Sequence, residues 1–110
     1  MVFFEKAFGI KASFIHESGA YAELSTGETA LAFASEELGE MNLPAGYQKN
    51  RKGSLPLGAE IVLTVDDVQA VFEKAVAKGG EALATPQEKP WGQTVAYLRD
   101  PNGVLIELAS

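Results

Sequence analysis

The 110-residue sequence contains no cysteine, only one histidine and one tryptophan, and no long run of apolar residues. Without cysteine, the chain has no disulfides, no thiolate metal ligands and no cysteine nucleophile. No stretch approaches the roughly 18 consecutive apolar residues that a membrane span requires. Residues 1–10 also lack the basic, apolar and small-residue parts of a signal peptide. We therefore expect a cytoplasmic protein without a membrane partner.

Basic residues are also few. Nine Lys and Arg stand against fifteen Asp and Glu, which gives a net charge of −6. Because this charge repels the phosphate backbone, nucleic acid is not an expected partner. The one basic cluster, Lys49, Arg51 and Lys52, lies in a loop-like stretch and is most simply a solvated surface. The negative charge favours cationic small molecules instead.

An internal repeat is the most informative feature that is present. The tetrapeptide FEKA at residues 4–7 recurs at residues 72–75, and both copies lie in helix-like segments followed by glycine. Short strand-like runs follow each copy and close on similar endings, residues 32–35 and 107–110. The shared order of elements predicts two copies of one unit.

The second copy has the clearer pattern. A run rich in β-branched residues at 60–65 predicts a strand. Asp66 is expected to cap the following helix, which has apolar residues at helical spacing and ends at Gly79-Gly80. Three further strands are predicted at about 81–85, 93–98 and 104–109, the last two joined by an Asp-Pro-Asn-Gly turn at 100–103.

The first copy predicts a helix at about 2–8 and strands near 11–17, 20–24 and 29–34, without an opening strand. The expected fold class is α+β, built from paired βαβββ units. We expect one domain over residues 1–110: a first unit at 1–35, a connecting loop rich in Pro and Gly at 36–58, and a second unit at 59–110.

These patterns resemble the glyoxalase, bleomycin-resistance and extradiol-dioxygenase superfamily, also called the vicinal oxygen chelate superfamily. The resemblance rests on LTVDDV at 63–68, KGG at 78–80, PWGQT at 90–94 and, above all, LRDPNGVLIEL at 98–108. It implies a curved, barrel-like mixed sheet around a ligand cavity, with the helices outside.

Metal enzymes of this superfamily typically hold one divalent ion with side chains from the first and last strands of each unit. By resemblance, Glu107 and Glu60 occupy two of these positions. The position of Glu60 usually holds a histidine. Ala32 occupies a third, and the strand for the fourth is missing. Two carboxylates without histidine would hold Mg²⁺ or Mn²⁺ only weakly. We therefore expect no metal cofactor; the alternative is a divalent cation such as Mg, Mn, Ni or Zn on Glu60 and Glu107.

The two glutamates are also candidates for binding an organic ligand. Ile106 and Leu108 alternate with Glu107, so its carboxylate is expected on the side of the sheet away from the core. A carboxylate there is costly unless water, a ligand or a cation reaches it. The alternative is that Glu60 and Glu107 pair with Arg99 or another cation.

Aromatic and small residues complete the predicted pocket. Trp91, between Pro90 and Gly92, either forms a cavity wall that stacks on a flat or cationic ligand or closes the end of the barrel. Tyr47 is either a lid residue or simply exposed, and His16 is expected to be structural or at the surface. The predicted ligand-binding residues are Glu60, Glu107, Trp91, Gln93, Tyr97, Ala32 and Tyr47; no catalytic residue is assigned.

Three functions are compatible with these features. The first is a metal-independent protein that sequesters a cationic or planar organic compound, similar to bleomycin-resistance proteins and hence a candidate for antibiotic resistance. The second is a divalent-metal-dependent lyase, isomerase or dioxygenase, and the third is a role in association alone. Because a missing strand leaves an open sheet edge, we also expect a homodimer.

Overall fold

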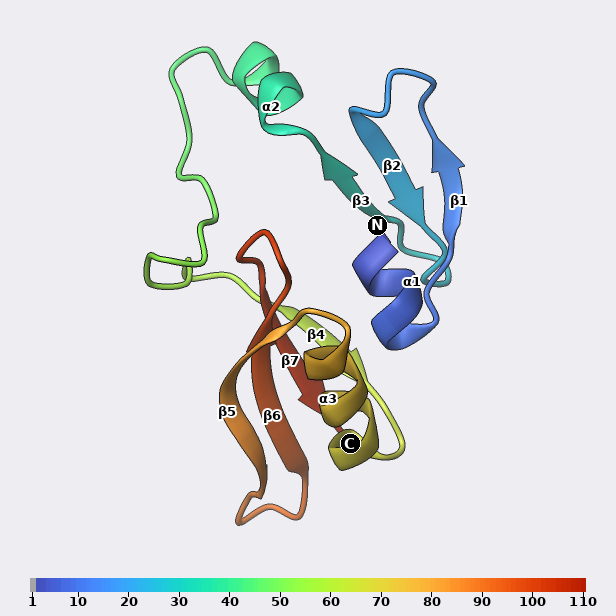
Figure 1. The fold of residues 1–110 in the computed structure, drawn as a ribbon, viewed down its shortest axis with the longest axis vertical. Coiled ribbons are helices and arrows are strands. Elements are labelled where there is room, and N and C mark those ends of the chain that lie inside the picture. The colour runs from blue at the N-terminus through green and yellow to red at the C-terminus, as the bar shows by residue number, and fades with distance from the viewer. Residues whose placement is uncertain (1) are drawn as a thin grey trace. The chain divides into compact units, whose positions relative to one another are not determined.

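Three helices and seven strands make up the part of the chain that the computed structural model describes, residues 2–110. They form two compact units, residues 1–49 and residues 50–110. The fold is mixed α+β with two separate sheets, and no closed barrel is formed within residues 2–110 (Figure 1). None of the three helices in this range has the length and apolar character needed to cross a membrane.

Unit 1, residues 1–49, is an antiparallel sheet of order β1-β2-β3 with two short helices. Helix α1 packs on one face of the sheet, where the rings of Phe4 and Phe33 lie 5.0 Å apart. Ala22 and Leu24 are buried, because alternate residues of a strand point to the same face. The elements are α1 (Val2–Phe8), β1 (Ala12–Ile15), β2 (Tyr21–Leu24), β3 (Leu31–Ala34) and α2 (Glu36–Asn42).

Helix α2 corrects the expectation of a loop over 36–58. Its N-cap is Ser35, whose hydroxyl oxygen accepts a hydrogen bond from the Leu38 amide at 3.2 Å. The negative charges of Glu36 and Glu37 in the first turn lie near the positive end of the helix dipole, which stabilises the helix. The prolines and glycines that predicted a loop, from Pro44 onward, all follow this helix.

Unit 2, residues 50–110, is a mixed sheet of order β4-β7-β6-β5 in which β4 runs parallel to β7. Helix α3 contacts β5, β6 and β7. The core beneath it contains Leu98, Ile106 and Leu108, each fully buried and each stabilising the fold by about 1.5–3 kcal/mol. The elements are β4 (Ile61–Thr64), α3 (Val68–Ala77), β5 (Glu81–Glu88), β6 (Thr94–Arg99) and β7 (Leu105–Ala109).

The start of α3 differs by one residue from the prediction. Asp67, not Asp66, is the N-cap, and its Oδ1 accepts a hydrogen bond from the Ala70 amide at 3.0 Å. The cap must directly precede the first helical residue, here Val68, to reach the free amides of the first turn. The predicted stop is confirmed, since Gly79 has a φ of +114°.

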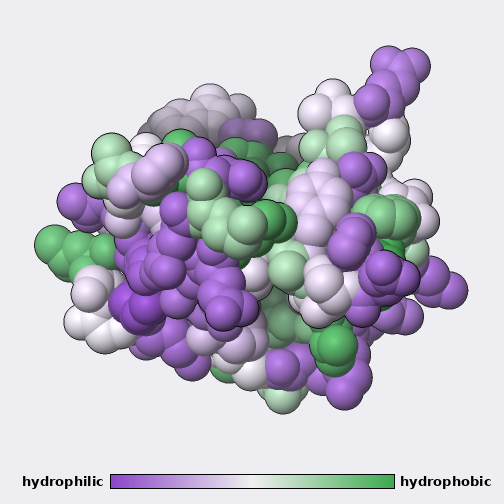
Figure 2. Space-filling view, turned by 90° about the horizontal axis from the view of Figure 1, so that it is seen from above, coloured by the Kyte–Doolittle hydropathy of each residue, from purple (hydrophilic) through white to green (hydrophobic). Residues whose placement is uncertain are grey.

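The surface carries isolated apolar side chains. Leu55 and Met41 are exposed at 89% and 77%. In the view of Figure 2, hydrophilic residues cover much of the visible face and hydrophobic residues lie between them in small groups. Such scattered apolar residues are usual for a globular domain.

Candidate functional site

The open face of unit 2, defined as the side of its sheet opposite α3, holds Glu107. Ile106 and Leu108 are buried on the α3 side, whereas Glu107 is half-buried. This burial pattern agrees with the alternation that the sequence indicates. Across the sheet, Glu107 lies opposite Tyr97 on β6 and is paired with Val62 on β4.

Tyr97 and Glu107 are joined by a hydrogen bond. The Tyr97 hydroxyl donates to Oε1 of Glu107 at 2.9 Å. This hydrogen bond, together with burial and the negative charges of Glu107 and Glu60, raises the pKa of Tyr97 to about 12. Tyr97 therefore keeps its proton near neutral pH and serves as a hydrogen-bond donor.

Glu60 is the third member of this group, which we call the Glu–Tyr–Glu cluster: Glu60, Tyr97 and Glu107. It lies one residue before β4 and is exposed. Although the residue as a whole is exposed, partial desolvation of its carboxylate, followed by the charge of Glu107, raises the pKa of Glu60 above its ordinary value, and a hydrogen bond from Tyr97 partly offsets this rise. A bound cation would stabilise the charged form of both carboxylates.

Arg99 does not neutralise this cluster, so the expected alternative of a pair with Glu60 or Glu107 is wrong for Arg99. Its side chain is only 2% exposed, and its guanidinium donates to backbone carbonyls at 2.5–3.2 Å. The planar guanidinium has five N–H donors, which suits several carbonyls at once. The acceptors are the carbonyls of Arg51, Lys52, Ser54 and Gly103.

Comparison with known proteins identifies the family of this fold. The model of the Glyoxalase/Bleomycin resistance protein/Dioxygenase superfamily matches residues 1–108. The chain belongs to this superfamily. The resemblance that the sequence motifs indicate is therefore confirmed.

Relatives in the superfamily are similar over nearly the whole chain. The uncharacterized protein YraH of Bacillus subtilis (strain 168) is 26% identical over 96% of this chain and 83% of its own length. A glyoxalase-related enzyme from Fulvimarina pelagi has a TM-score of 0.83 at 21% identity, over 97% of this chain and 74% of that one. A glyoxalase/bleomycin resistance protein/dioxygenase family enzyme from Burkholderia phytofirmans PsJN has a TM-score of 0.75 at 21% identity, over 98% and 84%. These structures show a shared fold.

A divalent metal site usually needs more protein ligands than this cluster offers. Within residues 2–110 no group of three or more His, Cys, Asp or Glu side chains is placed to hold a metal ion. Glu60 and Glu107 are two carboxylates, and their neighbour Tyr97 keeps its proton. This donor set does not fit the three or more protein ligands that divalent sites usually use.

Trp91 and Gln93 lie apart from the cluster. Trp91 is in the turn between β5 and β6 and is 69% exposed. Its Nε1 donates to Oε1 of Gln93 at 2.8 Å, and Nε2 of Gln93 donates to the Ser110 carbonyl at 3.1 Å. Gln93 is four residues from Tyr97, about 13 Å along an extended strand. The two residues form a separate patch at the far end of β6.

Unit 1 contains the other two predicted residues. Ala32 lies on β3 opposite Glu23, on the side away from α1. Tyr47, in the loop that follows α2, packs back against this helix, since a Cβ added at Gly39 would lie 2.9 Å from the Tyr47 hydroxyl oxygen. Tyr47 is 38% exposed, so the contact with Gly39 still leaves part of its ring open to solvent.

His16 is engaged in a local turn. Its Nδ1 accepts a hydrogen bond from the Ser18 amide at 3.1 Å and lies 2.8 Å from the Ser18 hydroxyl oxygen. Both residues are exposed in the β1–β2 connection. This geometry agrees with the expected structural or surface role.

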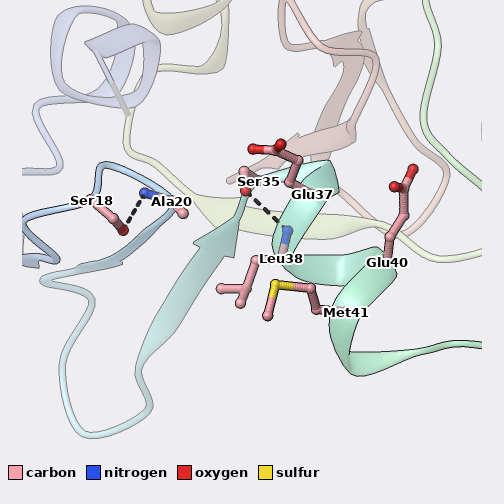
Figure 3. Close-up of a pocket in the computed structure, with 7 residues that line it drawn as sticks. All are labelled: Ser18, Ala20, Ser35, Glu37, Leu38, Glu40 and Met41. Atoms are coloured by element: carbon pink, nitrogen blue, oxygen red, sulfur yellow. Dashed lines mark hydrogen bonds between the residues drawn. The ribbon is translucent and has the colours of Figure 1, made fainter.

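A groove of about 580 Å³ in unit 1 contains none of the predicted site residues (Figure 3). It lies between α2 and the β1–β2 turn, with Leu38 and Met41 side by side on α2. The Ser18 and Ser35 hydroxyl oxygens accept local amide hydrogen bonds, so both are used in the turn and the helix cap. The lining residues are Ser18, Ala20, Ser35, Glu37, Leu38, Glu40 and Met41.

Proposed function

We propose that the protein binds a small cationic or planar organic compound without a resident metal, as drug-sequestering members of its superfamily do. The observation that carries this proposal is the Tyr97–Glu107 hydrogen bond with Glu60 beside it. The cluster concentrates two carboxylates on an open sheet face, and within residues 2–110 no basic side chain pairs with them. A positively charged ligand would provide the missing counter-charge.

The three side chains have different roles in this proposal. Glu60 and Glu107 attract the cation, and partial burial of Glu107 makes that attraction stronger than it would be in bulk water. The Tyr97 hydroxyl keeps one oxygen of Glu107 in a defined position. Binding, rather than turnover, is then the function.

We also propose that the two units are paired copies within one domain. The last two strands of each sheet pair in the same way: Glu23 lies opposite Ala32, and Tyr97 lies opposite Glu107. The residue after each sheet's last strand, Ser35 or Ser110, donates its amide to a carbonyl at the start of the neighbouring strand, that of Ala20 directly before β2 or that of Thr94, the first residue of β6. This correspondence supports Ala32 as the counterpart of Glu107, so unit 1 adds no carboxylate at that position.

Calorimetric titration tests the proposed function. With N-methylquinolinium as the probe and chelator-treated protein, we expect saturable binding that weakens about tenfold in Glu107→Gln, because one close charge is lost. Glu73→Gln makes the same charge change on α3, on the opposite side of the sheet, and should leave the affinity unchanged. As the pH falls through the raised pKa of Glu60, that carboxylate is protonated and the affinity should fall.

The competing function is a metal-dependent lyase, isomerase or dioxygenase with Glu60 and Glu107 as ligands. The proximity of the two carboxylates is the observation that favours it. Binding of one Mn²⁺ or Ni²⁺ per chain that is lost in Glu107→Gln, with no binding of the organic cation, would replace our proposal by this one. Equal affinity of the probe for the parent protein and Glu107→Gln would also contradict the proposed site.

We further propose a cytoplasmic homodimer. Strand β3 is an edge strand that pairs only with β2 in the described chain, and its sequence, LAFA, has no charge or proline to block pairing. In unit 2, the corresponding β7 is covered by β4. Light scattering at micromolar concentration should give twice the 11.7 kDa mass of one chain; the mass of a single chain would contradict the dimer.

A further inference from the structure

A second open face lies in unit 1, on the side of its sheet opposite α1. Phe14, Glu23 and Ala32 form one row across the three strands, because Phe14 is paired with Glu23 and Glu23 with Ala32. Tyr21 and Ala34 form the next row. None of the aromatic or acidic side chains in these rows belongs to the Glu–Tyr–Glu cluster.

Three aromatic rings lie near one another on this face, and one of them, Tyr21, contacts the Glu23 carboxylate. The ring of Phe14 lies 6.4 Å from that of Tyr21 and 6.5 Å from that of His16, and Phe14 is 49% exposed. The Tyr21 hydroxyl donates to Oε2 of Glu23 at 2.9 Å. Within residues 2–110 this is the one hydrogen bond that reaches the Glu23 carboxylate, and no basic side chain pairs with it.

A half-buried carboxylate with aromatic rings on the same face of the sheet matches an organic cation. A positive charge near Glu23 gains Coulomb attraction and also lies near ring faces, whose negative charge attracts cations. Ala32 and Ala34 are small and exposed, so a flat molecule can approach the sheet beside the rings. A purely apolar ligand would leave the Glu23 charge without a partner.

We infer that this face, which we call the cation face (Phe14, Tyr21, Glu23, Ala32 and Ala34), binds the flat, charged part of an aromatic organic cation. Glu23 provides the opposite charge, while Phe14 and Tyr21 contact the aromatic body. The inference rests on the proposed function only in taking an organic cation as the ligand. Its residues are separate from those of the Glu–Tyr–Glu cluster.

Titration of the 110-residue protein followed by two-dimensional amide NMR tests the cation face. N-methylquinolinium should shift the amide signals of β1 and β2, whereas neutral 2-methylquinoline at pH 8 should bind much more weakly. Glu23→Gln and Phe14→Leu should each weaken binding at these signals about fivefold. Tyr21→Phe keeps the ring and should retain the affinity within about twofold.

Matched controls separate binding from folding and from the proposed function. Glu17→Gln removes the same charge from the β1–β2 connection and should leave the affinity unchanged. Thermal unfolding of each variant identifies any loss of fold. Unchanged affinity in Glu23→Gln and Phe14→Leu, or equal binding of the neutral quinoline, would overturn the inference.

The Glu107→Gln variant distinguishes the two proposals. If it weakens binding while Glu23→Gln does not, the cation face is wrong and the proposed function stands. If Glu23→Gln weakens binding while Glu107→Gln does not, the cation face stands and the Glu–Tyr–Glu cluster is not the site. Absence of any binding by the probe would contradict both.

Discussion

Replacement of Arg99 by methionine is expected to lower the free energy of unfolding by about 3 kcal/mol or more. Arg99 is 2% exposed, and its guanidinium donates four hydrogen bonds to carbonyls. Three of these acceptors lie in the loop at residues 51–54. Methionine keeps much of the side-chain volume but leaves the carbonyls without their donor, so the loop loses its attachment to β6.

Urea unfolding followed by circular dichroism measures this loss. Because a domain of this size is stable by only about 5–15 kcal/mol, the shift in midpoint should be large. Arg99→Lys keeps the charge but not the planar group of five donors, and should show an intermediate loss. Lys52→Met removes an exposed side chain whose backbone carbonyl still accepts from Arg99, and should change stability by less than about 0.5 kcal/mol. A loss below about 1 kcal/mol in Arg99→Met would contradict the assigned role.

Gly103→Ala is expected to destabilise the protein by about 3 kcal/mol through two separate effects. Gly103 has a φ of +97°, which costs an alanine about 1–2 kcal/mol. In addition, a Cβ at this position would lie 2.8 Å from the carbonyl carbon of Arg51 and 3.0 Å from a guanidinium nitrogen of Arg99. Because the nearest atom belongs to the backbone, the loop must move to make room.

Gly92→Ala is the matched control for this prediction. Gly92 has nearly the same φ, +95°, but a Cβ added there would meet no atom within 4 Å. It should therefore show only the conformational cost, about 1–2 kcal/mol. The difference in unfolding free energy between the two variants measures the close approach of the loop. Equal losses would show that the loop does not lie against Gly103.

Both predictions concern the surroundings of the Glu–Tyr–Glu cluster. Arg99 is two residues from Tyr97 on β6, and side chains two apart on a strand share a face. The loop that Arg99 holds thus borders the open face of unit 2 one row from Tyr97. Release of this loop should make binding of the cation weaker as well as unfolding easier.

The local sequence determined most of the elements of unit 2. The β-branched run before Val65, the helical spacing of apolar residues in α3 and the Asp-Pro-Asn-Gly turn are signals that act within a few residues. The side of the sheet on which Glu107 lies also followed from alternation along one strand. In contrast, α2 was missed because Ser35 and two glutamates are a weak signal beside the glycines and prolines that follow.

Only the tertiary structure decided which side chains meet. Arg99 binds carbonyls 45 to 48 residues away in the chain, so no local pattern could separate this arrangement from a pair with Glu60 or Glu107. The grouping of Phe14 with Tyr21 and Glu23 likewise depends on the register of two strands, although the alternation of Tyr21 and Glu23 was a signal in the sequence. Secondary-structure propensity depends on residues that are close in the sequence, whereas strand pairing and buried hydrogen bonds join residues that are far apart in it. The sequence by itself therefore determined the elements and the family, and the tertiary contacts decided the partners of each charged group.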